Sequence, residues 1–446
     1  MQSSPLNLRR IFHSWWPLAA SWLLMSGEAP ALSAIVARLA DPEINLAAYG
    51  GVVFPLALII EAPIIMLLAA STALSRDWAS YKRIYRFMMV TSAGLTVLHL
   101  LIVLTPIYYL VVEDLLHAPA EIVQPARTGL IIMLPWTWSI AYRRFHQGVL
   151  IRFGRSKAIT TGTFIRLLTD LLVLAAGYLI HDIPGIVVAT SAVALGVISE
   201  AGFIGLVVRP VLRNQLRTAP PVDPPLTQAA FMDFYLPLVM TSLISLLVNP
   251  IGSAAIGRMP FPVESLALWQ VLGGLIFMVR SLGIAYNEVV VALLDEIRSS
   301  KALRQFASCL IVSTTLLWIL LVATPFANTW FTRIMALDAD LAEMAKLGAW
   351  IAIPLPAISV LQSWFQGAIL HSRKTGAITE AVGIYLLSNL LTLLLGIAWG
   401  KTMGIYIGLG SLVLSSAVQT FWLWLRSRPT LDSLQARDTE PGGLHG

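Results

Sequence analysis

Two acidic residues inside apolar stretches are the first candidates for chemistry. Glu28 and Glu61 each open a Glu-Ala-Pro tripeptide within a long apolar run. A charged side chain costs roughly 3 kcal/mol at the centre of a bilayer, so such residues usually face a cavity or a partner. Each following proline, Pro30 or Pro63, leaves one helical carbonyl without its hydrogen bond. A carboxylate beside a freed carbonyl suits a proton or Na⁺. The alternative is a helix kink whose carboxylate pairs with a neighbouring helix.

Asp170 and Glu200 extend this set, because they lie at comparable depth in two further apolar runs of the first half. We therefore expect Glu28, Glu61, Asp170 and Glu200 to be the candidates for a proton or cation coupling site. Asp170 also has a structural alternative. Arg166 stands four residues before it, and this spacing suits an ion pair within one helix.

The second half carries a different set of polar residues. Arg280 and Glu288 are eight residues apart on one predicted helix and therefore share a face, and Asn389 stands at the position that matches Asp170. A fixed guanidinium in a cavity favours phosphate or carboxylate recognition. A static ion pair, for example with Glu61, is an equal alternative. We expect Arg280, Glu288 and Asn389 to line a substrate cavity.

The sequence carries no pattern for enzymatic catalysis. It contains no Gly-rich phosphate loop, HExxH pair or nucleophile elbow in a fitting context, so neither ATP-driven pumping nor hydrolysis has local support. The single cysteine, Cys309, excludes an intramolecular disulfide and offers no metal cluster. We expect no catalytic residue, no metal site, and no cofactor other than a bound H⁺ or Na⁺.

The elements that must position these residues are membrane-spanning helices. A chain of 446 residues that is 57% hydrophobic and only 12% charged cannot cover a soluble globule with polar surface. An apolar run of about 20 residues crosses roughly 30 Å of hydrocarbon. Twelve such runs follow one another, near residues 15–38, 47–74, 87–112, 128–150, 158–180, 184–208, 229–257, 266–294, 306–331, 345–370, 376–399 and 404–425.

The distribution of charge sets the orientation. The net charge of +6 could suggest nucleic acid, but the basic residues gather in alternate loops. Counted from a cytoplasmic N-terminus, most of the 30 lysines and arginines, including Arg143 and Arg144, fall in inner segments, and only Arg166 and Arg280 fall within helices. By the positive-inside rule both termini are cytoplasmic. We expect a protein of the cell membrane, the bacterial inner membrane, that contacts lipid and binds no nucleic acid.

The chain contains an internal duplication. Residues 17–38 align without gaps with residues 237–258 at an offset of 220, sharing an opening Pro-Leu, a mid-helix proline, a Ser-Ala pair and a closing arginine. Residues 145–160 align with residues 364–379 at an offset of 219, through a Gln-Gly pair and a basic turn. Shared hydrophobicity alone does not place proline, glycine and glutamine in register. The chain is therefore predicted to consist of two similar halves.

Each half holds six helices, an even number, so both halves enter the membrane from the same side. The fold class expected is an all-α integral membrane protein of twelve helices, with a pseudo-two-fold axis along the membrane normal and a cavity between the halves. The predicted organisation is a first bundle, a proline-rich cytoplasmic linker, a second bundle and a polar, disordered tail, at residues 1–208, 209–228, 229–426 and 427–446.

Alignment of the two halves predicts asymmetric chemistry. Three of the four acidic positions become Val248, about Ile284 and Asn389 in the second half, and no acid matches Glu200. The buried acids are therefore concentrated in the first half, while Arg280 belongs to the second.

Three stretches carry a resemblance to a known superfamily. SGEAPALSAIVARL in the first helix, and FHQGVLIRFGRSKA and FQGAILHSRKTGA at matching turns, resemble the multidrug, oligosaccharidyl-lipid and polysaccharide flippase superfamily, which includes the multidrug and toxic compound extrusion transporters. Within it the chain most resembles the progressive ankylosis protein family, also through LLDEIR after the eighth helix. Glu28 matches the Gly-Glu of that family's first helix, whereas Glu61 has no clear family counterpart.

This resemblance implies alternating access by rocking of two halves, which extrusion members couple to inward H⁺ or Na⁺. We therefore expect a monomeric secondary active transporter that exports a small molecule. One alternative is an ankylosis-like exporter of anions such as pyrophosphate, nucleotide or citrate. Another is a flippase for a lipid-linked saccharide, for which more helices or more cavity arginines than the two counted above would be typical.

Overall fold

The chain folds into helices. The computed structural model describes residues 6–294, 296, 299–372 and 376–439, and within these ranges every regular element is helical. Two compact units form, unit 1 from Met1–Pro30 and Val271–Gly446 and unit 2 from Ala31–Gln270. The expected all-α membrane class is confirmed.

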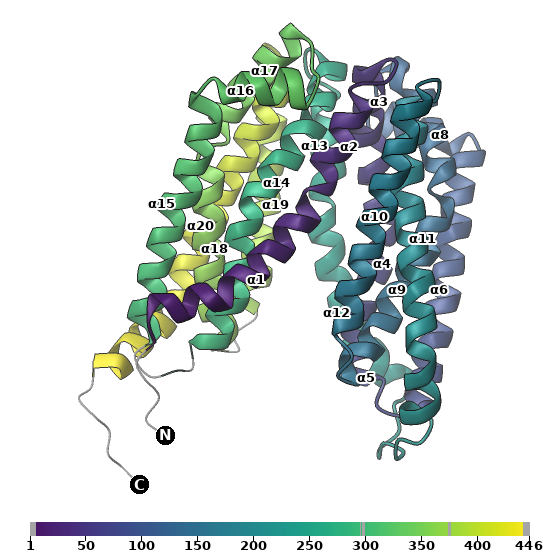
Figure 1. Cartoon of the computed structure of the whole chain (residues 1–446), viewed down its shortest axis with the longest axis vertical. Coiled ribbons are helices and arrows are strands. Elements are labelled where there is room, and N and C mark those ends of the chain that lie inside the picture. Colours follow the sequence, from purple (N-terminus) through teal and green to yellow (C-terminus); the bar gives the residue numbers. More distant parts are fainter. Residues whose placement is uncertain (1–5, 295, 297–298, 373–375, 440–446) are drawn as a thin grey trace. The chain divides into compact units, whose positions relative to one another are not determined.

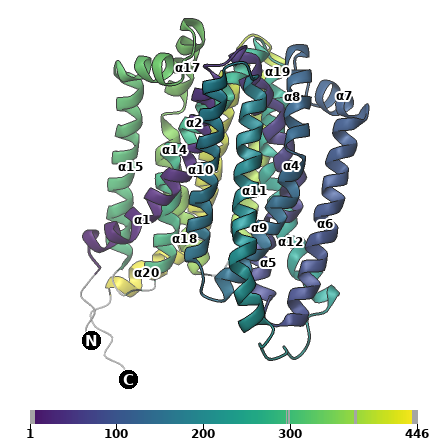
Figure 2. The same ribbon diagram turned by 45° about the vertical axis from the view of Figure 1, so that its right-hand side comes forward.

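Unit 2 is centred on α9, which packs against α4, α5, α6 and α11, while α10 and α11 lie side by side (Figure 2). Its elements are α3 (Pro42–Ala48), η1 (Tyr49–Val53), α4 (Phe54–Ile65), α5 (Leu67–Leu74), α6 (Trp78–Leu104), α7 (Ile107–Tyr109), η2 (Leu110–Leu115), α8 (Ala120–Ile132), α9 (Leu134–Arg152), α10 (Lys157–Ile180), α11 (Gly185–Val211), η3 (Leu212–Leu216), α12 (Gln228–Leu246) and α13 (Val248–Ile256).

Unit 1 repeats this arrangement, with α18 against α15 and α20, and α19 beside α20 (Figure 1). Its elements are α1 (Leu8–Ser26), α15 (Ser299–Ala323), α16 (Phe326–Asn328), η4 (Thr329–Ile334), α17 (Ala339–Ile351), α18 (Pro354–His371), α19 (Gly376–Trp399) and α20 (Gly404–Thr439). The chain passes between the units twice, within α2 (Glu28–Val36) and within α14 (Pro262–Leu293).

These units differ from the halves of the sequence at the first helix of each half. Contacts place α1 in unit 1 with the second-half helices, and α12 and α13 in unit 2 with the first-half helices. The predicted boundaries at 208, 228 and 426 describe the duplication and stay predictions.

Both first helices break at one position of the duplication. α1 ends before Gly27 and α12 ends before Leu247, in each case three residues ahead of a proline, Pro30 or Pro250. A proline in a helix removes the hydrogen bond to the carbonyl four residues earlier and clashes with it. The break predicted from Pro30 is confirmed, and Glu28 is the first residue after it.

The backbone itself records the duplication. Left-handed φ values are uncommon outside glycine, yet such residues recur in pairs at offsets of 220 or 219. The pairs are Asp41 (φ 48°) with Phe261 (φ 55°), His117 with Ala336 (both φ 51°), and His181 (φ 60°) with Gly400 (φ 63°). Element lengths recur too: α1 and α12 have 19 residues, α2 and α13 have nine, and α10 and α19 have 24.

The π-helix η1 explains why the offset between the two halves changes from 220 to 219. Gly148 on α9 faces Leu68 and Ser71, and Gly367 on α18 faces Asn287 and Val290, which fixes an offset of 219 in this region. The offset is 220 before η1, and α14 has no π-helix at the equivalent place. A π turn holds one extra residue. Glu61, which follows η1, therefore corresponds to Arg280 and not to a position near Ile284.

Eleven helices of the described residues are long and apolar enough to cross a membrane. The predicted segment not among them is 128–150, which forms α8 and α9. Its polar residues include Arg143 and Arg144, which lie inside α9 and not in an inner loop as predicted. The count of twelve spans stays a prediction.

Two segments expected to be irregular are held in place. α20 continues through residues 427–439, where disorder was expected, and Asp438 accepts hydrogen bonds from the Ser300 backbone N–H and hydroxyl. In the linker, the Val222 N–H donates to Asp77 Oδ2 at 3.0 Å, while Asp77 Oδ1 caps α6 by accepting from the Ser80 N–H at 2.8 Å. Residues 440–446 lie outside the described ranges.

Asp77 supplies a stability prediction with a defined pH dependence. Burial acts to raise the pKa of its carboxyl, but the hydrogen bonds from Ser80 and Val222 outweigh burial and hold the pKa below its ordinary value. This stabilisation is present above the unfolded pKa of about 3.9 and is lost as pH falls through the folded value. Asp77→Ala should cost about 1 kcal/mol of unfolding free energy near pH 6.

Thermal unfolding of the detergent-solubilised protein measures this effect. Asp77→Ser keeps a capping hydroxyl and loses the linker bond, so it should fall between wild type and Asp77→Ala. An Asp77→Ala deficit that persists undiminished below pH 3 contradicts the account.

Candidate functional site

Unit 2 encloses a cluster of six ionisable side chains from four helices. We call it the unit-2 charge cluster: Glu61 on α4, Arg143 and Arg144 on α9, Arg166 and Asp170 on α10, and Glu200 on α11. Arg144 lies within electrostatic range of four of the others. The structure thus brings together three of the four predicted coupling acids with three arginines.

Glu200 is the centre of this cluster. Its side chain is fully buried, and it accepts hydrogen bonds from Arg143 and from Gln147 Nε2, the latter at 2.9 Å. Arg166 Nε lies 3.6 Å from Glu200 Oε2. Gly162 leaves room for the carboxylate, because a Cβ there would lie 3.2 Å from Glu200 Cγ. Glu200 therefore joins α9, α10 and α11 through one neutralised carboxylate.

Asp170 is buried against α11. A methyl group on Gly196 would overlap Asp170 Oδ1 and lie 3.2 Å from Arg166 Cγ. Glycine at 196 thus lets the two helices approach at the acid. Arg166 extends across to Glu200, and the intrahelical pair predicted between Arg166 and Asp170 stays a prediction.

Glu61 is a buried acid with one carboxylate oxygen outside any hydrogen bond of the described residues. Its side chain is 4% exposed, and Oε2 has no hydrogen-bond partner among the described residues. Its electrostatic neighbours are Arg144, then Arg143. The Nε atom of Arg144 likewise has no partner within the described ranges. Glu61 and Arg144 therefore interact by charge without a hydrogen bond that fixes them.

Pro63 shapes the backbone beside Glu61. α4 ends at Ile65, and the Pro63 carbonyl accepts a hydrogen bond from the Tyr235 hydroxyl of α12 at 2.6 Å. The helix continues through Pro63, so its break lies after the proline, whereas the Glu-Ala-Pro tripeptide predicts a kink before it.

Unit 1 holds the other predicted residues. Glu28 is partly buried at the start of α2, and Gly274 of α14 approaches the adjacent Pro30, since a Cβ there would lie 3.2 Å from Pro30 Cδ. Glu288 is exposed and accepts a 3.4 Å hydrogen bond from Trp22 Nε1. Glu28 belongs to unit 1 and Glu61 to unit 2.

Arg280 and Asn389 lie in a polar environment without acids. The electrostatic neighbour of Arg280 is Tyr385, and no carboxylate of the described residues forms an ion pair with it. The Asn389 amide donates to Ser411 Oγ at 2.9 Å, while its buried Oδ1 has no partner within the same ranges.

The two units contain equivalent networks that differ in charge. At an offset of 219, Gln362 and Gln419 occupy the positions of Arg143 and Glu200, and they too are joined, Nε2 to Oε1 at 2.9 Å. The remaining members of the cluster change as well: Arg144 becomes Ser363, Arg166 becomes Tyr385, Asp170 becomes Asn389 and Glu61 becomes Arg280. The contact between α18 and α20 recurs, while six charged residues become one.

Several of these residues were not predicted from the sequence. Arg143 and Arg144 are predicted to lie in a loop, although their counterparts at an offset of 219, Gln362 and Ser363, lie within an apolar run. Gln419 is not predicted by a pattern of acidic residues, because it is the neutral counterpart of Glu200. The signal for it is the alignment of a glutamine with a glutamate in an apolar run.

A scan against models of known protein families finds no match, and a search of curated proteins finds none either. Solved structures do match along most of the chain. An inward-facing multidrug resistance MATE family transporter of the MOP superfamily aligns with a TM-score of 0.69 at 14% identity, covering 94% of this chain and 98% of the other. The chain has the MATE fold.

Two further structures place this fold in a wider group. A MOP superfamily transporter from Pyrococcus furiosus, described as having a binding pocket of reverse polarity, aligns with a TM-score of 0.61 at 15% identity, covering 95% of this chain and 96% of the other. The lipid II flippase MurJ aligns with a TM-score of 0.61 at 14% identity, covering 93% and 90%. The resemblance to this superfamily seen in the sequence is confirmed at the level of fold.

The Arg143–Glu200 pair can be tested against its neutral counterpart. Removing one partner of a buried pair leaves an uncompensated charge and costs about 3 kcal/mol. Glu200→Gln and Arg143→Gln should each lower the unfolding temperature. The double variant, which copies Gln362 and Gln419, should recover much of the loss.

Thermal unfolding in detergent provides the double-mutant cycle. Glu380→Gln is the matched control, since the Glu380–Arg426 pair is exposed and should contribute less than about 1 kcal/mol. Additive losses in the double variant would show that the two residues are not coupled.

Proposed function

We propose that this protein is a secondary active transporter that exports a small molecule across the cell membrane by alternating access. The observation that carries the proposal is the MATE fold with equivalent networks of opposite character, charged in unit 2 and neutral except for Arg280 in unit 1. Transporters of this kind bind substrate and coupling ion at interior polar groups.

Glu61 is the proposed coupling residue, with inward H⁺ or Na⁺ as the driving ion. Its free Oε2 can accept a proton or ligate a cation, and neutralising Glu61 would remove one of the two acidic neighbours of Arg144. Glu28, at the helix break of α2, is a second candidate. Asp170 and Glu200 are held in packed contacts. We therefore propose that they neutralise and position Arg166 and Arg143.

Organic or phosphate anions are the second candidate substrate class, and Arg280 is the observation that favours them. A guanidinium with no acidic partner in the described residues can bind a phosphate or carboxylate. Asn389 and its unpartnered Oδ1 add a polar group one turn from Tyr385. Glu288 is exposed and bonded to Trp22, which favours it less as a substrate ligand.

Lipid-linked saccharide transport is a further alternative. Arg143, Arg144, Arg166 and Arg280 all lie within helices, so the count of two intramembrane arginines that argued against a flippase no longer applies. We place the protein in the bacterial inner membrane as a monomer with both termini in the cytoplasm. Neither an enzymatic activity nor a bound cofactor forms part of the proposal.

Metabolite profiling of the growth medium tests the function and Glu61 together. Cells that express the wild-type protein should accumulate a compound outside that control cells lack. Glu61→Gln should reduce its appearance by at least tenfold, because the variant cannot exchange a proton or hold a cation there. Glu343→Gln, which alters an acid that is 72% exposed, should export normally.

Equal export by Glu61→Gln and wild type would contradict the coupling assignment. If the exported compound is an anion, Arg280→Gln should lower its export more strongly than Glu343→Gln. No difference between the medium of expressing and control cells would contradict the transporter proposal itself.

A further inference from the structure

One end of α6 forms a hollow with an unusual combination of side chains. The hollow has a volume of about 540 Å³, and we call it the α6 pocket. Six residues of α6 and Gln228 of α12 line it. The α6 residues are Ala79, Lys82, Arg83, Arg86, Phe87 and Val90. Their spacing of three and four places them on one face of the helix.

The cationic part of this pocket has no acidic partner. Lys82, Arg83 and Arg86 are exposed, and none forms an ion pair within the described ranges. Two cations lie over the ring of Trp78, one turn earlier on α6. Lys82 Nζ is 5.4 Å from the ring centroid and the Arg217 guanidinium is 4.7 Å from it. The nearby Asp77 is already engaged by Ser80 and Val222. An anion would offset the repulsion among these cations.

The same face of α6 becomes apolar beyond the arginines. Val90, Val97 and Leu101 are 68%, 53% and 50% exposed. Gly94 lies between them, and a Cβ there would touch nothing within 4 Å. The face therefore continues as an open apolar track into the membrane.

Packed aromatic side chains form one side of the pocket. Phe87 meets Phe231 and Tyr235 of α12 edge-on, with ring centroids 4.9 and 5.2 Å apart. The duplication repeats this corner: Phe306 corresponds to Phe87 and meets Trp15 edge-on at 5.8 Å.

The arginines are not required by that packing. At an offset of 219, Lys301 keeps the lysine of Lys82, but Ala302 and Gln305 replace Arg83 and Arg86. The corner thus forms in unit 1 without them. The arginines of the α6 pocket are an addition of the first half, and their exposure points to a ligand.

We propose that the α6 pocket binds a phospholipid with an anionic headgroup. Arg83, Arg86 and Lys82 would hold the phosphate, since guanidinium groups bind phosphate oxygens in pairs and basic pockets beside membrane helices bind acidic headgroups. An acyl chain would lie along Val90, Gly94 and Val97. The leaflet is the one that this end of α6 reaches, which is cytoplasmic on the predicted topology.

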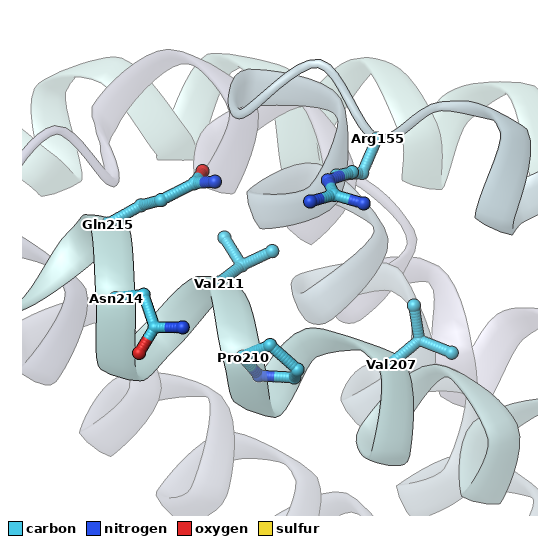
Figure 3. Close-up of a pocket in the computed structure, with 6 residues that line it drawn as sticks. All are labelled: Arg155, Val207, Pro210, Val211, Asn214 and Gln215. Carbon is cyan, nitrogen blue, oxygen red and sulfur yellow. The ribbon is translucent and has the colours of Figure 1, made fainter.

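A second hollow shows the contrast. It has a volume of about 320 Å³ at the end of α11, where the Arg155 guanidinium faces Asn214 and Gln215 across Val211 (Figure 3). It offers one cation, Arg155, against the three of the α6 pocket. A lipid is therefore assigned to the α6 pocket alone.

Lipid retention by the full-length protein tests this proposal. The protein is equilibrated in nanodiscs of equal parts phosphatidylglycerol and phosphatidylcholine, released into detergent, and examined by native mass spectrometry. Wild type should retain phosphatidylglycerol selectively. Arg83→Ala/Arg86→Gln, which installs the residues of unit 1, should weaken that retention by roughly 30-fold, on the basis of two surface cations.

Lys301→Gln/Arg304→Gln is the matched control, because it removes two cations from the corresponding part of α15 and should retain the lipid as wild type does. A thermal shift provides a second readout. Phosphatidylglycerol should raise the unfolding temperature of wild type and control but not of the α6 variant.

Equal retention of phosphatidylglycerol by the α6 variant and wild type would overturn the proposal. So would equal retention of the two lipids by wild type. If inorganic phosphate at the same concentration shifts the unfolding temperature as much as phosphatidylglycerol does, the ligand is a free anion and the lipid assignment is wrong.

Discussion

The buried pair of Arg143 with Glu200 is the interaction on which unit 2 depends. A membrane core offers no water to solvate a charge, so a carboxylate in that position is stable only with its donors in place. Arg143 and Gln147 approach Glu200 from α9, and Arg166 approaches it from α10. Glycine at 162 and 196 lets α10 and α11 close around these groups. The close packing of α9, α10 and α11 and the neutralisation of Glu200 therefore depend on each other.

The duplication shows that this geometry does not itself require charge. Gln362 and Gln419 make the equivalent contact in unit 1, and Asn389 bonds to Ser411 and Ser415 where Asp170 packs on Gly196. Neutral amides satisfy each other without desolvating an ion, which is the less costly arrangement in a low-dielectric interior. The charges of unit 2 exceed what its packing needs, and this excess supports a functional role. Arg280 of unit 1 occupies the position that corresponds to Glu61 of unit 2, so the charge at this position has opposite signs in the two halves.

Much of the fold could be predicted because its signals are local. Apolar length identifies spans, and proline fixes the breaks before Glu28 and Val248 by removing one backbone donor. The duplication was visible because proline, glycine and glutamine kept their register. The one-residue change at η1 was not visible, since a π turn preserves composition while it shifts every later residue.

The candidate site was predictable only in part. The acids were found by their cost in an apolar run, but their partners lie on other helices, where sequence spacing gives no distance. Arg143 and Arg144 read as loop residues because they stand near a basic turn. Their carboxylate partners on α4 and α11 allow the helix to continue through them.

Under the proposed alternating access, the two units would change their relative position when Glu61 changes its ionisation state. Spin labels can be attached to cysteines that replace Glu121 and Asp340, which are exposed residues at equivalent positions of α8 and α17, in a Cys309→Ser background. Double electron–electron resonance then measures the distance between the two labels. The account predicts two distance populations whose ratio changes with pH or Na⁺ in wild type and stays fixed in Glu61→Gln. A single distance under all conditions, or an unaltered response in Glu61→Gln, would contradict it.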